Sequence, residues 1–182
     1  MRFFRKLRGN QLAPTGNVNL RIRTPLESHL WKLAQEHADR AEAASESDST
    51  EMREAIGAIV MSAACLEAYV NAVLIEELRC SEEVLDRSLE GKWELAAETI
   101  GQPFDKGLQP FQDLNWLAGE RNYILHYKPA WKEPVKTARG RASEASARLS
   151  REAARRAVQT CQALIIDLSE KRGEAPPRWF SG

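Results

Sequence analysis

The stretch that decides the fold is residues 51–78, which read EMREAIGAIVMSAACLEAYVNAVLIEEL. Its apolar residues recur every three or four positions, the period of an α-helix with one buried face. The polar run just before it supplies serine and threonine N-caps. The sequence therefore predicts a long core helix whose apolar stripe contains Ile56, Ile59, Val60, Ala63, Val70, Val73, Leu74 and Leu78.

Two polar residues interrupt this stripe. Glu67 lies seven residues from both Val60 and Leu74, near the middle of the predicted apolar face, and Asn71 follows one turn later. Burying an unpaired carboxylate is very costly, so Glu67 must find a cationic partner or stay protonated.

Helical patterns continue on both sides of this segment. We expect an all-α, up-and-down bundle of four to five main helices over residues 26–172, between an extended basic N-terminal arm (1–25) and a C-terminal tail (173–182). Pro129 and Pro134 predict a loop to about residue 142, and no strand pattern is evident. The expected helices are a first one from Leu26 with a face of Leu26, Leu30, Leu33, His37 and Ala41, short ones at 81–91 and 92–100, one from Pro110, and a last one from Ser143 or Ser146.

Length and composition favour a soluble protein. The chain has 182 residues, 43% hydrophobic and 29% charged, which is typical of one globular domain. The sequence offers neither an uninterrupted apolar run of ~20 residues nor a signal-peptide pattern, so we expect no membrane span and a cytoplasmic location. Cys65, Cys80 and Cys161 show no metal-binding spacing, and we expect free thiols, no metal and no cofactor.

The net charge of zero hides an asymmetry. Residues 1–26 carry six Lys/Arg and no acid, residues 27–127 carry eight against twenty Asp/Glu, and residues 128–182 carry twelve against six. The basic ends are compatible with nucleic-acid contact, and solvated helix faces produce the same pattern.

The usual nucleotide-binding, zincin and hydrolase motifs are absent from the sequence, and one dense polar cluster remains at 121–128, RNYILHYK. Asn122 and His126 are four residues apart, so the amide is placed to orient the imidazole. Arg121 lies five residues before His126, about 140° around a helix. Arg121 also falls on a core-facing stripe with Phe111, Leu114 and Leu125, which makes Glu67 its natural partner.

An arginine with a histidine is a minimal set for cleaving a phosphodiester without metal. The histidine accepts a proton from a ribose 2′-hydroxyl, and the arginine holds the phosphate as charge builds on its oxygens. One copy supplies a base but no separate acid, whereas two copies across a two-fold interface supply both.

The order Arg121-Asn122-Tyr123-Ile124-Leu125-His126 resembles the RX4-6H motif of HEPN domains, and residues 63–71, AACLEAYVN, are similar to the second helix of many members. The resemblance implies a dimeric all-α bundle and, for active members, metal-independent endoribonuclease activity, often in toxin–antitoxin or phage-defence systems. It implies catalytic Arg121 and His126, with Asn122, Glu67, Asn71 and Tyr127 in support. Members paired with nucleotidyltransferase antitoxins often carry a tyrosine at the position of Lys128.

Two other interpretations stay open at this point. A HEPN-like dimer without catalysis would serve as a binding or assembly module for an antitoxin or another partner protein. His126 would then be a histidine at a helix C-terminus, where its charged form meets the helix dipole. A helical adaptor in which the Arg/His spacing is coincidental is the third interpretation.

Overall fold

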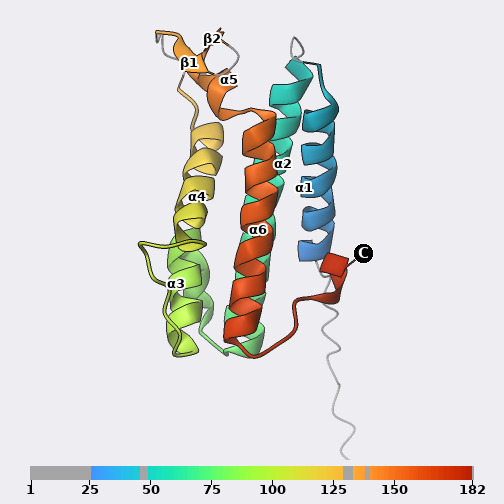
Figure 1. Cartoon of the computed structure of the whole chain (residues 1–182). Helices are drawn as coiled ribbons and strands as arrows, with labels where there is room; N and C mark the ends of the chain where they lie inside the picture. Colours follow the sequence, from blue (N-terminus) through green and yellow to red (C-terminus); the bar gives the residue numbers. More distant parts are fainter. Residues whose placement is uncertain (1–25, 46–48, 129–132, 138–139, 182) are drawn as a thin grey trace, which may run out of the picture.

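The computed structural model describes residues 26–45, 49–128, 133–137 and 140–181 (Figure 1). It confirms the predicted all-α bundle. The expected N-terminal arm lies outside the described residues. The α-helices are α1 (Leu26–Ala43), α2 (Ser49–Ala72), α3 (Leu89–Thr99), α4 (Phe111–Leu125), α5 (Glu144–Arg148) and α6 (Arg151–Lys171).

Helix α2 is the centre of the bundle. It contacts α1, α3, α4 and α6, and it continues into a π-helical turn, Val73–Glu77. Helices α3 and α4 lie on one side of α2 and α6, and α1 lies on the other (Figure 1). The predicted stripe is buried along most of its length, because Ile59, Ala63, Val70 and Leu74 have almost no exposed surface. The apolar period of this segment thus places it correctly in the core.

The segment Ser49–Glu77 is also the one helical stretch, among the described residues, that is long and apolar enough to cross a membrane. In the fold, 56% of its most apolar window is buried against the other helices. A central helix of a soluble bundle passes the same length and composition test, since it is apolar around much of its circumference.

The buried face of α1 differs from the predicted one. Ala41 is buried as predicted, but Trp31 and Ala34 are buried in place of Leu26 and Leu33, which are exposed. The predicted face was therefore rotated by about one residue. Burying the large indole of Trp31 removes more apolar surface from water than burying a leucine does, which explains why the indole sets the orientation of the helix.

Three connections were predicted wrongly. Residues 81–91 do not form a helix ending at Gly91: a short 3-10 turn, Glu82–Asp86, precedes α3, and the Ser88 hydroxyl caps α3 by accepting from the Gly91 amide at 3.2 Å. The last helix is split in two, because Ser143 and Ser150 each cap a helix of their own. The expected loop to 142 contains an antiparallel pair of three-residue strands, β1 (Val135–Thr137) and β2 (Gly140–Ala142). Strands this short carry too few residues for a visible alternation.

The C-terminal segment returns to the start of the bundle. A short 3-10 turn, Arg178–Ser181, places the ring of Phe180 4.7 Å from the ring of Trp31, and Trp179 stacks on Phe180. The turn therefore helps to cover the apolar side of α1.

Candidate functional site at the end of helix α4

The predicted motif occupies the last turn of α4. His126 is the C-cap residue, and its amide donates to the Asn122 carbonyl oxygen at 2.9 Å. Both side chains are exposed. A helix C-terminus favours positive charge, so this position suits either a proton-accepting histidine or a simple helix cap.

Arg121 is less buried than the sequence predicts. Its side chain is 38% exposed, at the margin of the core, and not on the core-facing stripe. Leu125, expected on the same stripe, is 54% exposed. The predicted partner is present, because Arg121 Nη2 lies 3.7 Å from Glu67 Oε2. That distance is an ion pair without a hydrogen bond.

A lysine that the sequence analysis missed is the main partner of Glu67. Lys92, in α3, donates from Nζ to Glu67 Oε1 at 2.6 Å, and its side chain is only 2% exposed. Glu67 itself is 33% exposed, so it lies at the edge of the apolar face and not in its middle. One carboxylate thus contacts two cations, and the cluster formed by Glu67, Lys92 and Arg121 carries an excess of positive charge.

A signal for Lys92 exists in the sequence. The residues at 89, 92, 93 and 96 share one side of a helix, and three of them are Leu89, Trp93 and Ala96, all buried. A lysine on such a stripe points to a buried ammonium with an acidic partner. The predicted boundary between helices at residues 91 and 92 separates Leu89 from Lys92, so the shared stripe was not recognised.

The supporting residues are not all brought together. The Arg121 Nη1 group donates to the Asn122 amide oxygen at 3.5 Å, while no hydrogen bond between the Asn122 and His126 side chains occurs among the described residues. Asn71 Oδ1 is buried without a hydrogen-bond partner in the described part of the chain. Tyr127 is 53% exposed and meets the ring of Tyr123 edge-on at 5.5 Å. The structure thus joins Glu67, Arg121 and Asn122, and leaves His126 and Tyr127 at the surface.

A groove and a smaller cavity, both lined by described residues, lie elsewhere in the bundle. A groove of about 720 Å³ runs between α1, α6 and the C-terminal turn, past His29, Trp31 and Trp179. A smaller one of about 380 Å³ lies beside α4 and α6 and includes Asp113 and Arg156. Neither is lined by Arg121 or His126. Within the described ranges, no three His, Cys, Asp or Glu side chains gather as metal ligands would.

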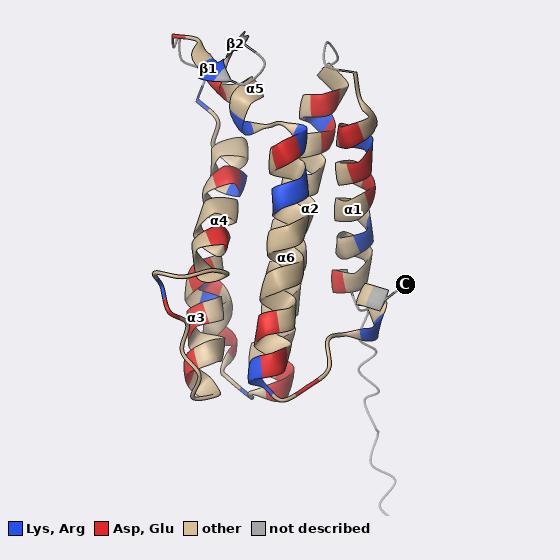
Figure 2. Cartoon of the chain, viewed as in Figure 1, with Lys and Arg blue, Asp and Glu red and all other residues tan. Residues whose placement is uncertain are grey.

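The described arginines from Arg148 to Arg156 are engaged in ion pairs. Figure 2 places acidic positions of the neighbouring helices beside the basic first half of α6. Arg148 binds Glu120 with two hydrogen bonds of 3.0 Å, and the hydrogen bond to Glu120 raises the pKa of Arg148 above its ordinary value. Further pairs are Arg151 with Glu51, Arg155 with Glu42, and Arg156 with Asp113. This arrangement favours a structural role for the stretch over guidance of RNA.

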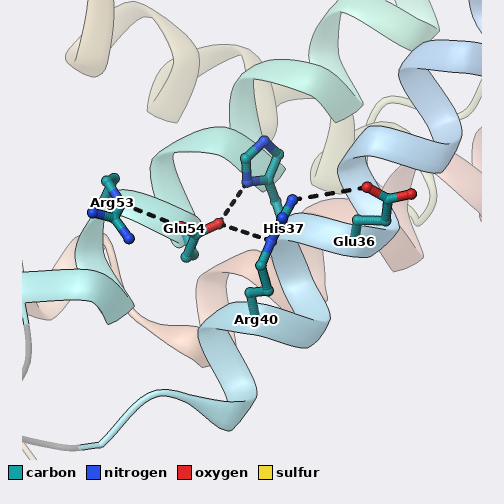
Figure 3. Close-up of polar contacts among 5 residues, drawn as sticks. All are labelled: Glu36, His37, Arg40, Arg53 and Glu54. Carbon is teal, nitrogen blue, oxygen red and sulfur yellow. Dashed lines mark hydrogen bonds and ion pairs between the residues drawn. The ribbon is translucent and has the colours of Figure 1, made fainter.

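A second polar cluster joins α1 to α2 (Figure 3). His37 Nδ1 lies 2.7 Å from Glu54 Oε2, and Arg40 and Arg53 contact the same carboxylate at 3.3 and 3.2 Å. The ring of His37 lies against Gly57, where an added Cβ would come within 2.7 Å of it. The absence of a side chain at residue 57 lets the two helices approach, which makes this cluster an interhelical contact.

The fold and this geometry define a class: an all-α bundle with an arginine and a histidine at the surface end of one helix, next to a carboxylate shared with a buried lysine. No family model, no curated protein and no solved structure matches the chain.

Proposed function

We propose that the protein is a metal-independent endoribonuclease of HEPN type, with Arg121 and His126 as its catalytic residues. The observation that carries the proposal is the half-exposed guanidinium of Arg121, which shares Glu67 with the buried Lys92. The cluster of Glu67, Lys92 and Arg121 carries one more positive charge than negative charges, and its half-exposed arginine lies five residues before the exposed His126. This arrangement favours binding of a phosphate group.

The chemistry needs only groups that this chain supplies. The 2′-oxygen of a ribose forms a bond to the adjacent phosphorus while its proton passes to His126, and the bond from phosphorus to the 5′-oxygen breaks. Arg121 stabilises the charge on the phosphoryl oxygens. The leaving 5′-oxygen takes a proton from the histidine of a second copy. The products are a 2′,3′-cyclic phosphate and a 5′-hydroxyl end.

The outer face of α4 supports the two-copy arrangement. Asn115, Gly119 and Asn122 are exposed and uncharged, and a Cβ added at Gly119 would meet nothing within 4 Å. An uncharged helix face with a glycine lets a second helix approach closely without burying a charge. A dimer through this face would bring two Arg121/His126 pairs together.

A non-catalytic binding module is the second candidate. The observation in its favour is the exposure of Leu125 and Tyr127 beside the motif, since exposed apolar side chains at the end of a helix suit a protein partner. Under this proposal the same face of α4 binds a second copy or a partner protein, and RNA is not cleaved.

Incubation with total RNA and tRNA in EDTA, read on a denaturing gel, tests the proposal. Wild type should cleave and leave cyclic-phosphate ends, while His126→Ala and Arg121→Ala should each abolish cleavage and keep helicity and dimerisation. Arg156→Ala is the matched control, because it removes an exposed arginine that is paired with Asp113. Cleavage that survives both site variants, or that disappears in EDTA, would contradict the mechanism. An intact dimer that cleaves neither RNA would favour the binding module.

The proposed activity also implies where the protein acts and what restrains it. A ribonuclease of this kind would act on cytoplasmic RNA, and it would need a partner protein to restrain it, as in a toxin–antitoxin or phage-defence system. Co-expression with such an antitoxin should relieve a growth arrest that wild type causes and that His126→Ala does not cause.

A further inference from the structure

A lysine is unfavourable at residue 92, because the position is buried among apolar side chains. Its neighbours on α3, Leu89, Trp93 and Ala96, are buried and apolar, and a leucine or methionine at residue 92 would continue their stripe. Burying an ammonium removes its hydration, which opposes folding even when the ammonium is paired. The hydrogen bond to Glu67 Oε1, at 2.6 Å, is what the ammonium gains.

The bond from Lys92 to Oε1 leaves Arg121 to face the second oxygen of Glu67, Oε2. Arg121 Nη2 lies 3.7 Å from Oε2, outside hydrogen-bond range. Glu67 therefore attracts the guanidinium without occupying its donors. Apart from Nη1, which donates to the Asn122 amide oxygen at 3.5 Å, the donors of Arg121 stay available for another anion.

The pair between Arg148 and Glu120 can be compared with the pair between Arg121 and Glu67. Arg148 faces Glu120, and the fork of its guanidinium takes both carboxylate oxygens at 3.0 Å. Paired arginine and carboxylate groups adopt this two-bond geometry when nothing competes for either oxygen. Two differences separate the carboxylates: Glu67 is already bound to a buried lysine, and it is 33% exposed where Glu120 is 9% exposed. The bound lysine is the difference that occupies a carboxylate oxygen.

We propose that Lys92 is a positioning residue, which holds Glu67 so that Arg121 remains free to bind a phosphate group of RNA. The inference rests on the proposed function only in taking RNA as the source of that phosphate. Lys92 is buried and does not touch the RNA. It acts through Glu67 on the guanidinium.

Binding of a 2′-O-methyl RNA oligonucleotide, followed by fluorescence anisotropy over a range of KCl concentrations, tests this role. The oligonucleotide has no free 2′-hydroxyl, so binding is measured apart from cleavage. Arg121→Ala should weaken binding about tenfold, as expected for one charge-assisted contact, and should lower the slope of log K against log [KCl] by about 0.7. Lys92→Met should weaken binding in the same direction and lower the slope as well, because Glu67 then binds Arg121 as Glu120 binds Arg148.

Two double variants separate this role from a structural one. Lys92→Met combined with Arg121→Ala should bind no more weakly than Arg121→Ala alone, because both changes remove the same phosphate contact. Lys92→Met combined with Glu67→Gln should recover the wild-type slope, because the competing carboxylate is gone. Lys171→Met is the matched control: it removes a lysine whose only carboxylate partner in the described residues is Asp167, at 2.8 Å, and binding should not change.

The outcomes distinguish the two proposals. If Lys92→Met keeps its helicity and binds like wild type while Arg121→Ala binds weakly, the role of Lys92 is overturned and the proposed function stands. If wild type does not bind, or Arg121→Ala binds like wild type, both are overturned. Should Lys92→Met lose its helicity, Lys92→Leu replaces it, because a leucine also offers Glu67 no donor and continues the apolar stripe of Leu89 and Trp93. The same loss of binding is expected, and wild-type binding by Lys92→Leu overturns the role of Lys92.

Discussion

The arginines of α6 and the cluster around Glu67 use the same side chains to different ends. On α6, each of Arg151, Arg155 and Arg156 contacts an acid on a neighbouring helix, so that the cations and carboxylates balance. At Glu67, two cations share one carboxylate, and one of the two is buried. A basic stretch in a sequence therefore does not by itself make a basic site in the fold. A cation can bind another anion only where the nearby carboxylates do not already occupy it.

Glu67→Leu should have the largest effect on stability. The change strands the ammonium of Lys92 in the core, and removal of one partner of a buried ion pair costs about 3–5 kcal/mol. Urea unfolding followed by circular dichroism measures the loss. Glu67→Leu combined with Lys92→Met should recover most of it, and a single variant as stable as wild type would contradict the burial of Lys92.

Gly57→Ala tests the second carboxylate that contacts more than one basic side chain, that of Glu54. Glu54 also contacts several cations, but its cluster ties α1 to α2, with the His37 ring 2.7 Å from where the new Cβ would lie. Overpacking of this kind costs about 1–3 kcal/mol. Thermal unfolding should report the loss. Gly91→Ala is the control, because the nearest atom to its Cβ would be Ser88 Oγ at 3.4 Å, an ordinary contact, and its stability should not fall.

The Glu54 cluster should also make stability depend on pH. The hydrogen bond with His37 is the largest cause that lowers the pKa of Glu54, below an ordinary value of about 4.3. A carboxyl whose pKa is lower in the folded state stabilises the fold above its unfolded pKa, and the contribution disappears as the pH falls through the folded pKa. Glu54→Gln should therefore be less stable than wild type at pH 7, with the difference shrinking below pH 4. A constant difference across this range would contradict the assignment.

Arg121→Ala should have the smallest effect. The sequence alone suggests a large cost, because it places Glu67 in the middle of an apolar face. In the fold Glu67 is partly exposed and keeps Lys92, so the loss should be below about 1 kcal/mol, as for an exposed ion pair. Arg156→Ala should cost a similar amount. A loss of 3 kcal/mol for Arg121→Ala alone would mean that Arg121 is a structural residue.

The sequence predicts the parts of the fold that depend on long periodic patterns. The core position of α2 follows from a pattern of more than twenty residues, and the pair between Glu67 and Arg121 follows from two polar side chains on apolar stripes. The face of α1 does not follow, because two overlapping apolar stripes compete there and only packing selects the one with Trp31. The break between α5 and α6 depends on which of several serines act as caps, which local pattern leaves open.

The candidate site is predictable only in part. The motif from Arg121 to His126 can be read directly from the sequence, and its catalytic role remains a prediction. Lys92 was missed because a helix was expected to begin there, which separated it from Leu89. In the fold, α3 begins at Leu89 after the Ser88 cap, and Lys92 shares a buried side with Leu89 and Trp93. The wrong helix boundary thus hid a lysine that is buried beside Glu67.

The contact between Phe180 and Trp31 has a consequence for the synthesis of the protein. Residue 180 follows all six described α-helices along the chain, so the ring that packs on Trp31 is synthesised only after the bundle helices. The apolar side of α1 is therefore covered later than the rest of the core.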